Sequence, residues 1–201
     1  MHISEGILSA PVLISGGALT VVGTAIGLKR LDYDRIMGVA IMAATFFVAA
    51  LIHVPLGPGS VHLVLNGLLG VVLGWACFPA ILIALLLQAI IFQYGGIVVL
   101  GVNTFNMAFP ALLCFYLLRP WLKRPQYRSA AGFIGGFLSV FLASLLMALA
   151  LALSDTGFLT TAKIIMAAHL PVMIIEGFIT MFTVSFLARV KPEILQLEPR
   201  S

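Results

Sequence analysis

"GWACFP", residues Gly74–Pro79, is the stretch that decides how this chain folds. It lies within a long apolar region and contains no charged residue. Either it joins two short helices that run in opposite directions, or it lies inside one long helix, over 61–94, that is kinked at Pro79. The choice sets the number of helices at seven or six and reverses the direction of every later segment.

The composition is that of a membrane protein. Hydrophobic residues make up 62% of the chain and charged residues 9%, and the mean hydropathy is +1.17. These values lie far outside the range of soluble domains. We expect a single transmembrane domain over residues 1–201. The net charge of +4 arises from few charges in three short stretches, so nucleic acid is not an expected partner.

Helix lengths follow from the thickness of the bilayer, which about twenty apolar residues cross as a helix. That length predicts an all-α bundle of seven transmembrane helices. Their expected ranges are 7–28, 36–54, 61–75, 79–94, 104–119, 129–153 and 169–189.

The distribution of lysine and arginine favours seven helices over six, because these residues accumulate in cytoplasmic segments. With seven spans and the N-terminus outside, ten of the 11 basic residues lie inside, and only Lys163 lies outside. With six spans the split is four against seven. The prediction is therefore an N-terminus outside and a C-terminus inside.

Two connections on the predicted outer side are rich in glycine or proline and carry no charge: "VPLGPGS" and "YGGIVVLGVN". Non-helical backbone at membrane depth is tolerated where protein buries it or where it lines a cavity. We therefore expect both loops to fold back over a site that faces outward. The first six residues lack the basic flank of a signal peptide, so Met1 is the expected mature terminus.

All four histidines, His2, His53, His62 and His169, lie on the outer side in this topology. An N-terminal X-His dipeptide offers the Met1 amine, the deprotonated amide nitrogen of residue 2 and Nδ1 of the imidazole. These close two chelate rings around one cation and leave a fourth position in the plane, for which His62 is the best candidate. A planar site of four nitrogens suits Ni(II) or Cu(II). The alternatives, equally weighted on the residues alone, are a solvated imidazole at His2 and a hydrogen-bonded residue at the start of a helix at His62.

Other polar residues have weaker assignments. His53 is either an interfacial residue or an entry ligand, and the former is favoured. His169 and Glu176 are seven residues apart and share a helix face. Glu176, inside an apolar span, should face the bundle interior, either as a proton or cation relay or paired with a polar neighbour. Candidates for hydrogen bonds that orient the ligands, or for contacts between helices, are Asn66, Gln88, Asn103 and Asn106.

Motifs for catalysis are missing from the sequence. It has no GxxxxGK[ST] stretch for ATP hydrolysis, no HExxH and no GxSxG. These features indicate a binding protein rather than an enzyme.

The assembled pieces resemble the CbiM/NikM family of substrate-capture (S) components of energy-coupling-factor cobalt and nickel transporters. The matching stretches are "MHISEG", "VPLGPGSVHLVLNGLLGVVLG", "QAIIFQYGGIVVLGVNTFNMAFPALL" and "HLPVMIIEGFIT". The resemblance implies a seven-helix S component with an extra N-terminal helix. It also implies a metal held by the Met1 amine, the His2 amide and side chain, and the His62 side chain.

The resemblance further implies partners and a location. The partners are a transmembrane coupling (T) subunit, two cytoplasmic ATPases and a small accessory membrane subunit, which would be a separate chain here. The location is the cell membrane of a prokaryote. No resident cofactor is expected, because Ni(II) or Co(II) is the transported substrate, and the sequence does not separate the two metals. The rival hypotheses are an S component for an organic micronutrient and an intramembrane enzyme that uses Glu176 and His169.

Overall fold

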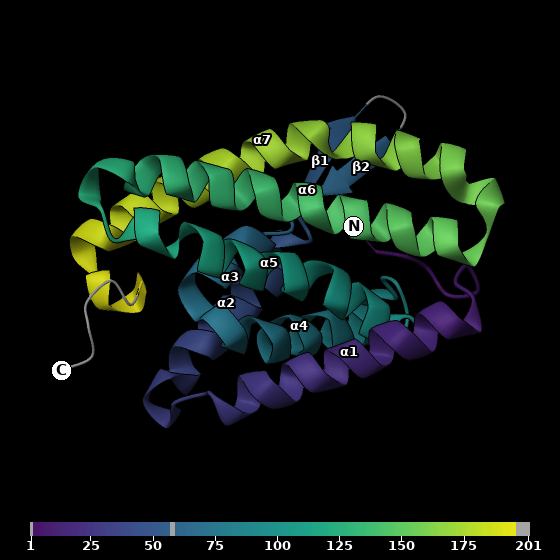
Figure 1. The fold of residues 1–201 in the computed structure, drawn as a ribbon, viewed down its shortest axis with the longest axis horizontal. Coiled ribbons are helices and arrows are strands. Elements are labelled where there is room, and N and C mark those ends of the chain that lie inside the picture. Colours follow the sequence, from purple (N-terminus) through teal and green to yellow (C-terminus); the bar gives the residue numbers. More distant parts are fainter. Residues whose placement is uncertain (1, 57–58, 196–201) are drawn as a thin grey trace.

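The computed structural model describes residues 2–56 and 59–195, and it shows a bundle of helices with one short β-hairpin (Figure 1). The helices are α1 (Ala10–Lys29), α2 (Ile36–Ala49), α3 (Asn66–Leu73), α4 (Cys77–Phe92), α5 (Leu100–Leu122), α6 (Arg128–Ser154) and α7 (Leu159–Val190). The strands are β1 (His53–Leu56) and β2 (Gly59–His62), and short 3-10 turns join several elements. The prediction of an all-helical membrane protein is confirmed at this level.

Glycines allow the helices to pack closely in the centre of the bundle. A Cβ atom on Gly70 of α3 would lie 2.1 Å from the carbonyl oxygen of Ala111 on α5, and one on Gly136 of α6 would lie 2.3 Å from the carbonyl oxygen of Glu176 on α7. There is no room for a side chain at either glycine, so the backbones of α3 and α5, and those of α6 and α7, are in direct contact, as is common in membrane helix bundles.

The chain reverses between α3 and α4, at the stretch singled out in the sequence. Residues later in α3 contact residues later in α5: Asn66 Nδ2 donates to the carbonyl oxygen of Met107, and Gly74 lies beside Phe115. The two helices are therefore parallel. Gly74 then adopts φ +56°, a left-handed conformation that favours glycine.

Helix α4 runs back in the opposite direction. Its first turn lies against the end of α1, where Gly27 faces Pro79. The loop after its last turn lies beside the start of α5, where Gly95 faces Asn103. "GWACFP" thus turns the chain round, and the alternative of one helix kinked at Pro79 is wrong.

Three predicted helix boundaries are also wrong. The helix expected over 61–75 starts only at Asn66, because residues up to His62 pair in the β-hairpin, where His53 is opposite His62. The helix expected over 36–54 ends at Ala49. The helix expected to start at His169 starts ten residues earlier, at Leu159. Apolar content marks only the membrane part of a helix, and the polar first turns of α7 extend beyond it.

Five stretches of the described chain are long and apolar enough to cross a membrane: Ala10–Lys29, Asn66–Phe92, Leu100–Leu122, Pro125–Ser154 and Lys163–Val190. The second of these contains the reversal at Gly74. Helix α2 has 14 residues and α3 has eight, so both are shorter than the roughly twenty that span a bilayer. The protein is a multi-pass membrane protein, and the count of seven spans stays a prediction.

Basic residues gather at one end of the bundle. Lys29 ends α1, Arg35 precedes α2, Arg119 lies near the end of α5 and Arg128 starts α6. In Figure 1 the end of α1 and the start of α6 lie at the left, and the start of α7 lies at the right. We call the left end the basic end. The side of the membrane on which it lies is a prediction from the charge rule alone.

Candidate metal centre

The N-terminal segment enters the bundle and is held there by Asn103 in the first turn of α5. Asn103 Oδ1 accepts the amide hydrogen of Ile3 at 3.0 Å, and Asn103 Nδ2 donates to the carbonyl oxygen of Ile3, also at 3.0 Å. Ile3 is only 2% exposed. This pair of bonds mimics one step of a β-ladder, so the backbone beside His2 has a defined position.

The loop between α4 and α5 closes over the same segment. The amide of Glu5 donates to the carbonyl oxygen of Gly95 at 3.2 Å, and the amide of Val98 donates to Glu5 Oε1 at 3.0 Å. A Cβ atom on Gly96 would lie 2.2 Å from the Glu5 side chain, and Gly96 has φ +127°. The prediction that "YGGIVVLGVN" folds back over a site is consistent with these contacts.

The rings of His2 and His62 meet, although the two residues are sixty positions apart. His2 Nδ1 lies 3.1 Å from His62 Nε2, and the ring centroids are 4.8 Å apart. Each outer nitrogen is held by an oxygen: His2 Nε2 lies 2.8 Å from Gln88 Oε1, and His62 Nδ1 lies 2.9 Å from the carbonyl oxygen of Leu63.

These oxygens determine which nitrogens carry protons. A backbone carbonyl only accepts, so His62 Nδ1 is the protonated nitrogen and Nε2 keeps its lone pair. Gln88 Nε2 faces the carbonyl oxygen of Phe47 at 3.5 Å, which turns Gln88 Oε1 toward His2 as an acceptor. His2 Nε2 is then protonated and Nδ1 keeps its lone pair. This tautomer assignment follows from the hydrogen-bond network, and it leaves two lone pairs facing each other.

The surroundings of His2 favour the neutral imidazole. Burial lowers the pKa of His2 to about 4, and the hydrogen bond to Gln88 opposes this shift. The Tyr94 ring lies beside it, with 5.8 Å between ring centroids. A neutral imidazole is the form that ligates metals.

Glu176 on α7 holds the backbone that follows His62. Its carboxylate accepts the amide hydrogens of Val64 and Leu65, the latter at 2.9 and 3.0 Å from its two oxygens. Glu176 is fully buried, and Leu65 has φ +54°, which is uncommon for a residue with a side chain. Glu176 is therefore paired with polar backbone groups, and a role as a proton or cation relay stays a prediction.

The remaining predicted residues divide between the cluster and the rest of the bundle. Asn103 lies beside His2 through its bonds to Ile3. Asn66 lies at the start of α3 and donates to the carbonyl oxygens of Met107 and Ser139, as an interhelical contact. His169 lies in the interior of α7, and its Nδ1 donates to the carbonyl oxygen of Ile165 in the same helix. Met1 and the side chain of His53 lie outside the described part of the structure.

Two features of the cluster have no counterpart in the sequence predictions. Glu5 tethers the loop that covers the segment, and Tyr94 stands beside the His2 ring. Both residues stand out in the sequence, since Glu5 is the first acidic residue of the chain and Tyr94 precedes the pair Gly95–Gly96. The sequence does not show which residues they contact.

Comparison with known proteins agrees with this geometry. Residues 2–194 match the model of a family described as CbiM, the cobalt uptake substrate-specific transmembrane region. The chain is a member of the CbiM family. It is 44% identical over 201 residues to a putative metal transport protein of Haemophilus influenzae, with 97% of each chain covered.

More distant CbiM-related proteins carry names that refer to either metal. A putative fused nickel transport protein, NikMN, of Archaeoglobus fulgidus is 29% identical and aligns with 98% of this chain and 68% of its own length. A cobalt transport protein CbiM of Carboxydothermus hydrogenoformans is 28% identical over 94% of this chain and 84% of its own.

A solved structure has the same fold. The crystal structure of a transition metal transporter superposes with a TM-score of 0.83 at 31% identity, and the match covers 94% of this chain and 93% of the other. The CbiM relatives are named as metal transport proteins, so the chain belongs with transporter components and not with enzymes. The resemblance to the CbiM/NikM family inferred from the sequence is confirmed.

Proposed function

We propose that this CbiM-family chain captures Ni(II) or Co(II) from outside the cell and is the S component of an energy-coupling-factor importer. The proposed ligands are the Met1 amine, the amide nitrogen of His2, His2 Nδ1 and His62 Nε2. The observation that carries the proposal is the 3.1 Å approach of His2 Nδ1 to His62 Nε2. Both nitrogens present lone pairs to the same small space.

The distance fits two neighbouring corners of a planar site. Metal–nitrogen bonds of about 2.0–2.1 Å at a right angle place two nitrogens about 2.9 Å apart. Facing lone pairs repel each other in the absence of a cation or a proton, and a divalent ion between them removes that repulsion. Gln88 and Leu63, which hold the outer nitrogens, have the role of groups that orient histidine ligands in other metal sites.

The number of side-chain donors supports ligation by the terminus. Among residues 2–56 and 59–195, no three His, Cys, Asp or Glu side chains gather into a metal-binding group. Two imidazoles fill half of a four-coordinate site, and we assign the other half to the Met1 amine and the His2 amide, which close two chelate rings. Binding would release protons from these groups, so the affinity should fall in acid.

Transport needs partners, because the chain has no nucleotide-binding motif. We infer a T component, two cytoplasmic ATPase subunits and a small accessory membrane subunit, as the family resemblance implies. We also infer a seven-span topology in a prokaryotic cell membrane, with the N-terminus outside. Metal release follows when the ATPase cycle shifts the bundle to a state of lower metal affinity.

The test is to acetylate the Met1 amine. Acetylation converts the primary amine into an amide and removes one ligand, and it changes none of the residues that make the described contacts. We expect nickel binding, measured calorimetrically on the protein stripped of metal in detergent, to be lost with an unchanged melting temperature. The matched control is the protein with a free amine carried through the same preparation, and it should bind normally.

The outcome also separates the rival hypothesis. An S component for an organic micronutrient would not bind nickel with or without the acetyl group, and unchanged nickel binding after acetylation would refute the N-terminal site. Competition between nickel and cobalt on the unmodified protein then decides which metal is preferred.

A further inference from the structure

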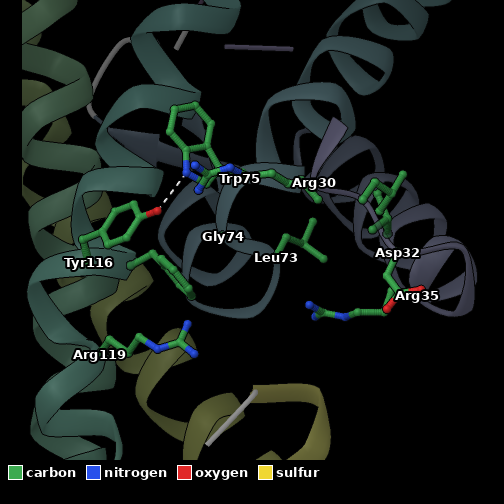
Figure 2. Close-up of a pocket in the computed structure, with 12 residues that line it drawn as sticks. Arg30, Asp32, Arg35, Leu73, Gly74, Trp75, Tyr116 and Arg119 are labelled. Atoms are coloured by element: carbon green, nitrogen blue, oxygen red, sulfur yellow. Dashed lines mark hydrogen bonds between the residues drawn. The ribbon is translucent and has the colours of Figure 1, made fainter. Parts of the chain in front are cut away.

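The basic end of the bundle contains a cavity of about 280 Å³, about 24 Å along α5 from Asn103. It lies where the end of α1, the start of α2, the turn between α3 and α4, and α5 come together. Its lining includes three arginines, Arg30, Arg35 and Arg119, and three aromatic residues, Trp75, Phe115 and Tyr116. Figure 2 shows these side chains around the space.

Each arginine is held in place by a neighbour. The Arg30 guanidinium lies 5.2 Å from the centre of the Trp75 ring, and that of Arg119 lies 4.9 Å from the centre of the Phe115 ring. Arg35 Nη2 donates to the carbonyl oxygen of Val72 at 3.2 Å. A guanidinium that stacks on a ring keeps the N–H groups at its edge for other acceptors.

The aromatic side of the cavity adds a polar group. Trp75 Nε1 donates to the Tyr116 hydroxyl oxygen at 2.8 Å. Since that oxygen accepts, the Tyr116 O–H is directed elsewhere as a donor. Tyr116 is 51% exposed, so a ligand in the cavity has access to it.

The charge of the cavity selects an anion. Asp32 is the acidic side chain in the lining, against three arginines, so the described lining has a net charge of +2. Arginine pairs with phosphate through two parallel hydrogen bonds more readily than lysine does.

An apolar groove of about 370 Å³ continues from this cavity along the bundle. The two share Leu31 and Val39 in their linings. The groove lies between α2 and α4 and extends from Val39 to Phe47, about 12 Å along α2. Its other members include Ala43, Ala44, Ile83 and Leu87.

We propose that this composite site binds an anionic phospholipid of the adjacent leaflet, with the phosphate in the arginine cavity and one acyl chain in the groove. A basic pocket at the end of transmembrane helices is a recurrent headgroup site. Tryptophan and tyrosine are typical of the membrane interface. The continuity of a phosphate-binding cavity with an apolar groove favours a lipid over a free phosphate, which would use only the first part. This inference needs membrane insertion and is independent of which metal binds at the other end.

The experiment measures phosphatidylglycerol bound to the full chain after delipidation, by native mass spectrometry. Charge-assisted hydrogen bonds from an arginine to a phosphate contribute about tenfold or more to binding. Arg119→Gln should therefore reduce phosphatidylglycerol binding about tenfold. Lys123→Gln is the control, because Lys123 carries the same charge at the same end of α5 and does not line the cavity. Equal retention in the two variants would overturn the proposal.

A second pair of variants tests the acyl groove without touching an arginine. Ala44→Trp places a ring in the groove and should also lower phosphatidylglycerol binding by several fold. Met37→Trp introduces the same ring at a position on α2 that is 72% exposed and outside the groove, and it should have no effect. If Ala44→Trp leaves phosphatidylglycerol binding unchanged, the proposal that an acyl chain occupies the groove is wrong.

Two further measurements distinguish other occupants. Inorganic phosphate at millimolar concentration should not displace the lipid, and full displacement would reassign the cavity to a free anion. In the intact transporter, loss of partner subunits from Arg119→Gln with unchanged lipid binding would reassign it to a protein contact. Phosphatidylcholine should bind more weakly than phosphatidylglycerol, because its headgroup has no net charge.

Discussion

Helix α5 connects two sites of opposite chemistry, and their difference lies in what surrounds the polar groups. At its start, Asn103 is 3% exposed and both of its side-chain atoms are bonded to the backbone of Ile3. Near its end, Arg119 is half-buried and borders an open cavity (Figure 2). The first site is closed by its own chain, and the second is open to the surroundings.

The histidine site presents nitrogen lone pairs to its centre, whereas the arginine cavity presents N–H groups. Hydrogen bonds to Gln88 and Leu63 leave His2 and His62 as acceptors toward each other. Guanidinium groups at the other end have no acceptor atoms. The histidine cluster therefore suits a cation held in rigid geometry, and the basic end suits an anion held more loosely.

The largest difference should come from His62→Ala. If the site binds with about 10–16 kcal/mol, as structural zinc sites do, one ligand of four is about a quarter of that free energy, so nickel affinity should fall about 60-fold or more. Calorimetry on the stripped protein measures it. His169→Ala is the control, since its ring bonds to its own helix. Equal affinities in the two variants would remove His62 from the site.

The next effect concerns the two hydrogen bonds by which Asn103 holds the N-terminal segment. Asn103→Ala removes two buried hydrogen bonds worth about 1 kcal/mol each, which corresponds to about 30-fold in nickel affinity. Asn103→Asp keeps the acceptor for the Ile3 amide and should lose less. Thr20→Val, which removes the bond from α1 to the carbonyl oxygen of Gly101, should leave affinity unchanged. If both Asn103 variants bind like the parent, docking of the segment does not limit binding.

A smaller effect is expected at Glu176, which acts on His62 through the backbone. Glu176→Gln keeps one acceptor for Val64 and Leu65 and should weaken nickel binding on the order of tenfold. Its control is Glu193→Gln, since Glu193 is exposed and pairs only with Lys191 at 3.5 Å among the described contacts. Nickel titrations at one pH compare the two. A larger loss of affinity than for His62→Ala would show that Glu176 has a more direct role.

The smallest effect tests the open site. Tyr116→Phe removes the acceptor of the Trp75 N–H, but water replaces it at an exposed position, so the free energy of unfolding should fall by less than about 1 kcal/mol. Nickel affinity should stay within twofold. Thermal unfolding and calorimetry measure both quantities. A change as large as that of Asn103→Ala would mean that the two ends are coupled.

Much of the fold could be predicted from the sequence because bilayers impose strong rules. The apolar content, the positions of α1, α5 and α6 and the reversal at Gly74–Pro79 follow from length, hydropathy and charge. The short hairpin was missed because Pro55 and Gly59 lie between apolar runs and look like an ordinary loop. The early start of α7 was missed because a helix that extends beyond the membrane loses the apolar signal.

The two histidines of the candidate site could be predicted from the sequence, and the residues that hold them in place could not. His2 and His62 could be named because an X-His terminus is a chelator and His62 was expected on the same side of the membrane, and the family resemblance pointed to the same pair. Gln88 and Asn103 were two among several amides with the same sequence context. Their roles depend on which helix faces point at the N-terminal segment, and Glu176 reaches Leu65 only because α7 crosses α3.

The sequence by itself determined that this is a membrane bundle of the CbiM family, with its basic residues at one end and a histidine directly after Met1. These features depend on hydrophobicity and charge distribution, because apolar segments of sufficient length insert into the bilayer as helices and basic residues stay at its surface. Only the tertiary structure decided that His2 and His62 approach within 3.1 Å and that three arginines surround one cavity. Both depend on how closely helices pack, because residues from distant segments meet only when backbones touch at positions such as Gly70 and Ala111.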